Sequence, residues 1–248
     1  MRTLILCEGK TDAVLLSYLL GKEAGWKYTR EKNLWLIDED DRKDESANWY
    51  KRGNDYILIC GVGGKTNFGN YFLNNLYQPI LQEAHKIDRL VYVIDKDNDS
   101  IEDLKIKIEA DLQPICNNII IGEWAENIFT DPFGMSKKID ILALIVPENN
   151  EGALEDVLLD AISEREYDKN LVDKSILFVD EIKDEAREYI INSRLELKAK
   201  LSVVFAIRSP QKVFSLIDEL IKSVDWEKYQ NIKNLFKKIL EIYLNDKK

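Results

Sequence analysis

The stretch that decides the fold reads Leu90-Val91-Tyr92-Val93-Ile94-Asp95-Lys96-Asp97. Five apolar residues in succession, rich in β-branched and aromatic side chains, indicate a strand buried on both faces, as in a parallel sheet covered by helices. The strand ends abruptly in acids at alternating positions, and extended geometry would place Asp95 and Asp97 on one side. Residues 90–94 are therefore expected to form a central strand whose carboxyl end carries acidic side chains.

Short apolar runs alternate with helical patterns on both sides of this strand. Strand-like runs occupy residues 3–7, 56–60 and 141–146, and helical patterns occupy residues 13–20 and 71–81. This order predicts βαβ units. We therefore expect an α/β fold, with a mostly parallel sheet flanked by helices.

After about residue 165 the pattern turns helical. Apolar residues recur there at three-and-four spacing, in segments 185–191, 195–207, 213–224 and 232–244. We expect an α/β domain over residues 1–165 and a helical C-terminal region over residues 166–248 that packs on it. The polar stretch 31–54 is predicted to be a β-hairpin or a surface insertion.

The bulk composition suits a folded protein of 248 residues, with 45% hydrophobic and 32% charged residues. The longest apolar runs fall far short of the ~20 residues that span a bilayer. The N-terminus reaches the charged Glu8 too soon for a signal peptide. We expect a cytoplasmic protein with no membrane partner.

Charge limits the choice of partners without excluding nucleic acid. The net charge of −10 disfavours broad nonspecific adhesion to phosphate backbones, which relies on protein cations. Metal ions held by carboxylates can still supply positive charge locally. A nucleic-acid enzyme therefore remains compatible with this composition.

Cysteine and histidine give no sign of a zinc or copper site. Cys7, Cys60 and Cys116 are widely spaced in apolar segments, so we expect buried thiols rather than disulfides or metal ligands. His85 is the only histidine and is assigned a structural role in a surface helix. Any metal site would therefore be built from oxygen ligands.

A second acidic element follows the first strand. Glu8-Gly9-Lys10-Thr11-Asp12 opens the first helix, so Glu8 lies at the strand's carboxyl end and Asp12 about one turn further on. Thr11 is expected to be the N-cap. Asp12 has a purely structural alternative, because acids stabilise a helix start. Since parallel strands end at a common edge, Glu8, Asp95 and Asp97 are expected to converge there.

A third acidic element, Gly152-Ala153-Leu154-Glu155-Asp156, starts a helix after the strand at residues 141–146. Glutamate in a first turn often only stabilises the helix. If Glu155 points back to the strand ends, Asp156 should face elsewhere, because it lies about 100° further round the helix. Clustered carboxylates repel unless a cation neutralises them, and oxygen ligands favour magnesium or manganese.

These three elements together resemble a TOPRIM domain, the fold shared by bacterial primases, topoisomerases, recombination proteins and nucleases of the overcoming-lysogenization-defect (OLD) family. The resemblance covers residues 1–165 and rests on Glu8-Gly9 and Asp95-Lys96-Asp97. Asp12 and the Gly152 to Asp156 segment are similar to OLD-like nucleases and to stand-alone TOPRIM-like proteins. No ATPase, primase or topoisomerase module is visible in the sequence, so substrate and pathway are not carried over.

The resemblance implies cleavage of phosphodiesters with two metal ions. Glu8, Asp95 and Asp97 would hold one magnesium or manganese ion, and Asp12 and Glu155 would hold the second or position water. A downstream lysine assists in such nucleases. Lys198 is the first candidate for that role, and Lys200 is the second.

Three functions are compatible with these patterns. The first is a metal-dependent nuclease acting on DNA or RNA. The second is a non-catalytic TOPRIM-like protein that binds nucleic acid, or a protein partner through its helical C-terminal region. The third is an NTPase, because the loop 61–66 resembles a P-loop, although Ile59 stands where the motif needs its first glycine. Trp26, Trp35 and Trp49 are expected to complete a core or to stack on bases.

Overall fold

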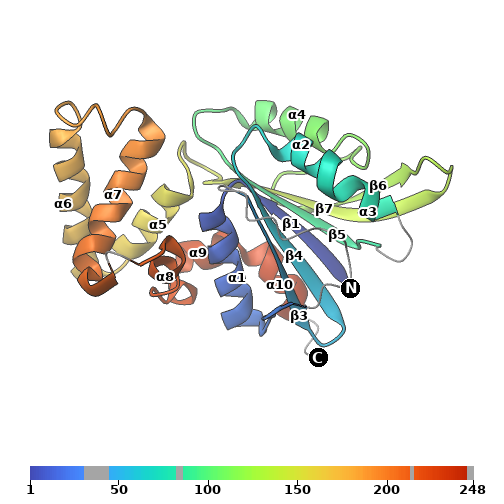
Figure 1. Ribbon diagram of the computed structural model, residues 1–248, viewed down its shortest axis with the longest axis horizontal. Coiled ribbons are helices and arrows are strands. Elements are labelled where there is room, and N and C mark those ends of the chain that lie inside the picture. The colour runs from blue at the N-terminus through green and yellow to red at the C-terminus, as the bar shows by residue number, and fades with distance from the viewer. Residues whose placement is uncertain (31–44, 82–85, 213–214, 245–248) are drawn as a thin grey trace.

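The computed structural model describes residues 1–30, 45–81, 86–212 and 215–244. Its centre is a seven-stranded sheet with the order β2-β3-β4-β1-β5-β7-β6 (Figure 1). The strands are β1 (Arg2–Cys7), β2 (Lys27–Thr29), β3 (Glu45–Arg52), β4 (Asp55–Val62), β5 (Arg89–Asp95), β6 (Trp124–Thr130) and β7 (Ser136–Val146). Strands β4, β1, β5 and β7 run parallel, whereas β2, β3 and β6 pair antiparallel at the two sides. The predicted mostly parallel α/β sheet is confirmed.

Alternate side chains of the central strands enter two separate cores. In β1, Ile5 and Cys7 belong to the core on one face, and Leu4 and Leu6 belong to the core on the other. All four are fully buried. This is why the strands are apolar at every position rather than at every second one.

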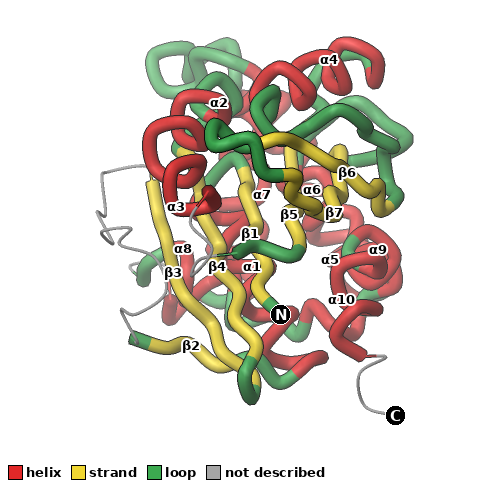
Figure 2. The backbone as a smooth tube through the Cα atoms, turned by 90° about the vertical axis from the view of Figure 1, so that its right-hand side faces the viewer, coloured by secondary structure: helices red, strands yellow, loops and turns green. Residues whose placement is uncertain are grey.

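Helices cover both faces of the sheet (Figures 1 and 2). One face packs against α2 (Phe68–Tyr71), a π-helical turn (Phe72–Leu76), α3 (Tyr77–Leu81) and α4 (Ile101–Asp111). The other packs against α1 (Lys10–Ala24), α5 (Leu154–Ser163), α9 (Gln230–Leu235) and α10 (Lys237–Leu244). The C-terminal region also contains α6 (Glu166–Ile182), α7 (Ser193–Arg208), α8 (Ile217–Ile221) and two 3-10 turns (Pro210–Lys212 and Trp226–Lys228).

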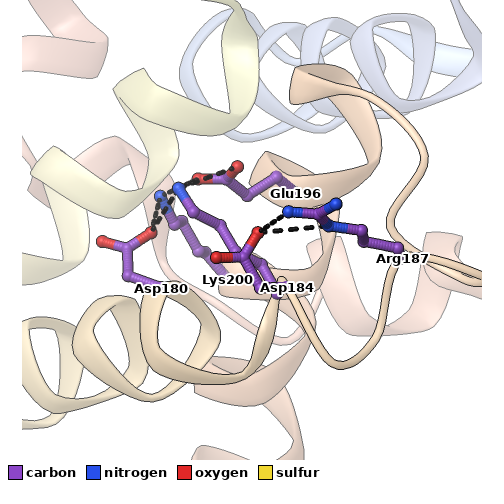
Figure 3. Close-up of polar contacts among 6 residues, drawn as sticks. Asp180, Asp184, Arg187, Glu196 and Lys200 are labelled. Atoms are coloured by element: carbon purple, nitrogen blue, oxygen red, sulfur yellow. Dashed lines mark hydrogen bonds and ion pairs between the residues drawn. The ribbon is translucent and has the colours of Figure 1, made fainter.

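Helices α6 and α7 stand to one side of the sheet rather than over it, at the left of Figure 1. Ion pairs join them: Lys200 of α7 lies 2.8 Å from Asp180 of α6, and Lys183 lies 3.4 Å from Glu196 (Figure 3). The region after residue 165 is thus helical and packs on the rest of the chain. The division at residue 165 itself stays a prediction, because one apolar cluster contains residues from both sides of it.

Three helical predictions need correction. In the described part of the segment 213–224, only Ile217–Ile221 are helical, as α8. Residues 185–191 form no helix, because α6 ends at Ile182 and a turn follows. Tyr189 and Ile191 are 75% and 70% exposed there, so the apolar spacing faces solvent and no core supports it. The segment 232–244 is divided at Phe236 into α9 and α10.

Residues 45–52 extend the main sheet. They form β3, which makes a hairpin with β4 in which Arg52 pairs with Asp55. The described half of the 31–54 stretch is therefore one strand of the main sheet, and its hairpin partner β4 lies outside that stretch. Residues 31–44, which include Trp35, and also His85 lie outside the described residues.

The remaining expectations about buried side chains are mostly confirmed. Cys7 and Cys60 are buried free thiols, but Cys116 is partly exposed in the loop after α4. Trp26 and Trp49 are buried, which favours the core interpretation of these rings over base stacking. None of the described helices combines the length and apolar composition that crossing a bilayer requires.

Helix α10 closes one face of the first strand. The hydroxyl of Tyr243 donates to Thr3 over 2.8 Å, and both residues are buried. The ring of Tyr243 meets the edge of Trp26, and its carbonyl accepts a 2.6 Å hydrogen bond from Arg52. The first strand and the last described helix therefore form one packing unit.

Candidate functional site

Glu8 and Asp95 lie at the carboxyl ends of two neighbouring strands. β1 and β5 pair in parallel with Cys7 opposite Val93, so Glu8 follows β1 at the same edge where Asp95 closes β5. Both carboxylates are buried, at 2% and 6% exposure. We use the term acidic edge for Glu8, Asp12, Asp95, Asp97 and Glu155.

Asp12 serves both helix capping and the acidic edge. Its Oδ2 accepts a 3.0 Å hydrogen bond from the backbone N–H of Gly9. Helix α1 begins at Lys10, two residues earlier than expected, so Gly9 is the N-cap and the prediction of Thr11 is wrong. Burial, reinforced by the charges of Glu8 and Glu155, raises the pKa of Asp12 to about 7. Asp12 therefore does stabilise the start of the helix, and the charges of two other acids of the edge also act on its carboxylate.

Asp95 connects the sheet to helix α5. Its Oδ1 accepts a 3.0 Å hydrogen bond from the N–H of Leu154, the first residue of that helix. Burial and the charges of Asp12, Glu8 and Glu155 hold the pKa of Asp95 well above its usual range. Folding thus forces negative charges together in a poorly solvated place, which a cation would relieve.

Asp97 departs from the extended geometry expected for it. Its backbone is left-handed, with φ 51°, and makes two hydrogen bonds with Gly152, of 2.6 and 3.0 Å. The strand ends at Asp95 because the chain turns here to pair with the loop before α5. The prediction that Asp95 and Asp97 lie on one side of a continuing strand is therefore wrong. Asp97 is half exposed and pairs with a lysine.

That lysine is Lys65, from the glycine loop after β4. Its amine lies 2.8 Å from the carboxylate of Asp97 and 2.6 Å from that of Asp99. The loop reaches the edge because the N–H of Gly64 donates to the carbonyl of Glu8 over 2.9 Å. Lys65 is therefore a counter-ion of the acidic edge.

Gly61, the first glycine of the 61–66 segment, serves close packing of the backbone. A Cβ on Gly61 would lie 2.9 Å from the carbonyl oxygen of Gly9 and 3.0 Å from the hydroxyl of Ser46. Gly61 and Val62 belong to β4 itself. These contacts, and the engagement of Lys65 by two carboxylates, give no support to the P-loop interpretation.

Arg194 is the second counter-ion and comes from helix α7. Its Nη1 lies 3.0 Å from Oε1 of Glu8. The other oxygen of Glu8 is buried and has no hydrogen-bond partner among the described residues. Burial raises the pKa of Glu8 even though the guanidinium of Arg194 lowers it. Glu8 therefore offers one unused acceptor toward the acidic edge.

Glu155 and Asp156 face different ways, as expected from their helix positions. Glu155 is 8% exposed, and its charge acts on Asp12 and Asp95. Asp156 turns back along α5, where its Oδ2 accepts a 2.9 Å hydrogen bond from the N–H of Ala153. Glu155 thus belongs to the acidic edge, whereas Asp156 caps the helix.

The two candidate lysines of α7 lie on opposite sides of that helix. Lys198 is exposed and lines a cavity together with Glu155. Lys200 instead points to α6, where it pairs with Asp180 and with Glu196 of its own helix (Figure 3). The structure therefore keeps Lys198 as a candidate and removes Lys200.

Of the functional groups, sequence reasoning missed the roles of Lys65 and Arg194. Lys65 could have been found, because its loop follows a strand that ends at the same edge. Arg194 gave no signal, since only the packing of α7 brings it to Glu8.

The acids of the edge suit a hard divalent cation by chemistry and by charge. They are all carboxylates, several are buried, and one oxygen of Glu8 has no partner among the described residues. In the described part of the chain, however, no three His, Cys, Asp or Glu side chains are grouped closely enough to hold a metal ion as they stand. Arg194 and Lys65 pair with carboxylates that a metal ion would need as ligands. A metal ion can therefore bind only if it displaces these two side chains.

Fold and site together define an α/β protein with a buried acidic edge at the carboxyl ends of its parallel strands. The model of a family described as protein of unknown function (DUF3226) matches residues 2–241, so the chain belongs to that family. No curated protein matches the sequence.

Two solved structures are similar over almost the whole chain but only distantly. Hypothetical protein PH0156 from Pyrococcus horikoshii OT3 has 17% identity and a TM-score of 0.48, with 98% of this chain and 100% of that one covered. The cytosolic domain of the T. maritima FeoB iron transporter in a GDP form has 11% identity and a TM-score of 0.20, with 99% and 96% covered. Both scores are below 0.5, so neither likeness bears on fold or chemistry.

Proposed function

We propose that this protein is a magnesium-dependent nuclease of the TOPRIM type, which cleaves phosphodiester bonds of DNA or RNA. The observation that carries the proposal is the buried pair Glu8 and Asp95, on neighbouring parallel strands, with Asp12 and Glu155 beside them. Burial of several carboxylates is costly even with Arg194 beside Glu8, and a cation-binding role accounts for it. The resemblance to TOPRIM domains supports the same assignment.

Different residues of the chain would bind metal ions, orient water and bind the phosphate. Glu8, Asp95 and Asp97 would hold one ion, and Asp12 and Glu155 would help to hold a second or orient water. Bound magnesium or manganese would supply the charge that activates water and stabilises the leaving oxygen. Lys198, exposed beside Glu155, would bind a phosphate oxygen on which charge accumulates.

Magnesium titration tests the metal site without relying on activity. A ligand that binds only the folded state stabilises it, so the melting temperature should rise with magnesium concentration. Asp95→Asn should blunt that rise, while it still offers an acceptor to Leu154. An unchanged wild-type melting curve at millimolar magnesium would remove the metal site from the proposal.

Cleavage assays on single- and double-stranded DNA and RNA test the chemistry. Glu155→Ala and Lys198→Ala should abolish metal-dependent cutting and leave the fold intact. The matched controls are Asp156→Ala, one position along α5, and Lys200→Ala on the opposite side of α7, and both should retain cutting. If the first pair cut at the wild-type rate, Glu155 and Lys198 have structural roles.

A second candidate is a non-catalytic protein that uses the acidic edge or the helical C-terminal region to bind nucleic acid or a protein partner. The favouring observation is that Arg194 and Lys65 already neutralise carboxylates of the edge, at 3.0 and 2.8 Å. Such a protein would retain nucleic acid without producing cuts, so the same assays separate the two candidates.

A further inference from the structure

A cavity of about 480 Å³ lies between α7, α8 and the start of α1. Its walls are mostly apolar and include Leu201, Phe205 and Leu220, and the hydroxyl-bearing Thr11 and Ser202 also line it. Sites for small organic ligands have this character, with apolar walls and a few polar groups, and volumes of roughly 300–1,000 Å³. The cavity is therefore large enough for one flat ring system with its attached sugar.

This cavity adjoins the acidic edge at Glu155. Glu155 lines it, and the same carboxylate acts on Asp12 and Asp95. Thr11 lines it from the first turn of α1, next to Asp12 in the sequence. A ligand seated in the cavity would therefore lie beside one carboxylate of the acidic edge.

One side of α7 carries charged side chains and then apolar side chains that face the acidic edge and the cavity. Arg194 pairs with Glu8, and Lys198, Leu201 and Phe205 line the cavity. These positions follow the spacing of a single helix face. Two cations are thus followed by an apolar wall, in which the ring of Phe205 is itself almost fully buried.

We propose that this cavity receives one unpaired nucleobase of a single-stranded substrate, whose neighbouring phosphate lies between Lys198 and the acidic edge. The proposal rests on the proposed function and names its substrate class. A nucleotide has the same order of chemistry as the site, a flat ring that packs between apolar walls followed by an anion that lysine and arginine bind. A base inside a duplex could enter only by leaving its stack.

The test fills the cavity from its exposed side. Ala206 is exposed on α7 and lines the cavity, so Ala206→Trp should block it without disturbing a buried position. Ser202→Trp makes a second block at another exposed lining position. The matched control is Ala110→Trp, because Ala110 is also an exposed helical alanine but lies in α4, on the other face of the sheet.

The probe is the 5′-monophosphate of 2-aminopurine deoxyriboside, whose fluorescence reports base stacking and which has no phosphodiester to cut. With manganese present, we expect the wild type and Ala110→Trp to quench it equally. Both cavity variants should bind it about tenfold more weakly. The ribonucleotide version of the probe compares the two sugars. Short single-stranded oligonucleotides should bind more tightly than duplexes of the same sequence.

Separate readouts distinguish failure of this inference from failure of the proposed function. Manganese affinity, measured by electron paramagnetic resonance, should be the same in Ala206→Trp and wild type. Equal nucleotide affinity in Ala206→Trp, Ser202→Trp and Ala110→Trp, or duplexes bound as tightly as single strands, overturns the cavity assignment even when manganese binds. Absence of manganese binding in the wild type instead refutes the metal site and the function proposed from it.

Discussion

Replacement of Asp12 by asparagine should stabilise the metal-free protein at neutral pH. The amide of the new side chain keeps an oxygen that can accept from the N–H of Gly9, which now donates to Asp12 over 3.0 Å. The replacement also removes one negative charge from a buried group of acids. Asp12→Asn therefore separates the capping role of Asp12 from its electrostatic cost.

The magnitude follows from the raised pKa. Burial and the charges of Glu8 and Glu155 move the pKa of Asp12 from 3.8 to about 7. The folded state thus binds this proton more tightly than the unfolded state, so the unfolding free energy is greatest at low pH and falls as pH rises from about 4 to about 7. At about 1.4 kcal/mol per pH unit, the loss amounts to about 4 kcal/mol.

Urea unfolding in EDTA at pH values from about 4 to 8 measures this effect. Asp12→Asn should differ little from the wild type near pH 4 and should gain about 2–4 kcal/mol above pH 7. Asp103→Asn is the control, because Asp103 occupies the third position of α4 but is exposed, and its effect should stay below about 1 kcal/mol. If Asp12→Asn does not raise the unfolding free energy, or raises it equally at both ends of the pH range, the electrostatic reasoning is refuted.

Three further substitutions test single contacts. Lys65→Met removes a cation that competes with metal ions, so manganese should bind several-fold more tightly in titration calorimetry, and weaker binding would make the lysine part of the metal site. Gly61→Ala places a Cβ 2.9 Å from the carbonyl of Gly9 and should lower stability by about 1–3 kcal/mol in urea unfolding; an unchanged midpoint would show that the two strands can separate slightly at no cost. Tyr243→Phe leaves the hydroxyl of the buried Thr3 without its donor and should cost about 1–3 kcal/mol, and a wild-type melting temperature would contradict that assignment.

The central sheet was predictable because its strands carry a strong local signal. Runs such as residues 90–94 are apolar at every position, which only a strand covered on both faces explains. The rule that parallel strands end at one edge then brought Glu8 and Asp95 together from distant parts of the sequence. Helix α7 was predicted for a related reason, since its apolar residues do face a core.

The remaining parts depended on contacts that a local pattern does not contain. Asp97 was expected in extended conformation, but pairing with Gly152 turns the chain there. Residues 185–191 have helical spacing without a core to cover. Arg194 reaches Glu8 only through the packing of α7. In each case the presence or absence of a long-range contact, rather than a local preference, determines the outcome.

The packing of α10 on β1 has a consequence for how the chain is made. A ribosome produces Thr3 among the first residues and Tyr243 only near the end of the described chain, yet the two share a buried hydrogen bond. Until α10 emerges, the part of this sheet face that α10 covers stays exposed, and exposed strand surface promotes aggregation. Completion of this face must therefore follow synthesis of α10, and a stalled chain that lacks residues 237–244 is expected to be a substrate for chaperones that bind apolar strands.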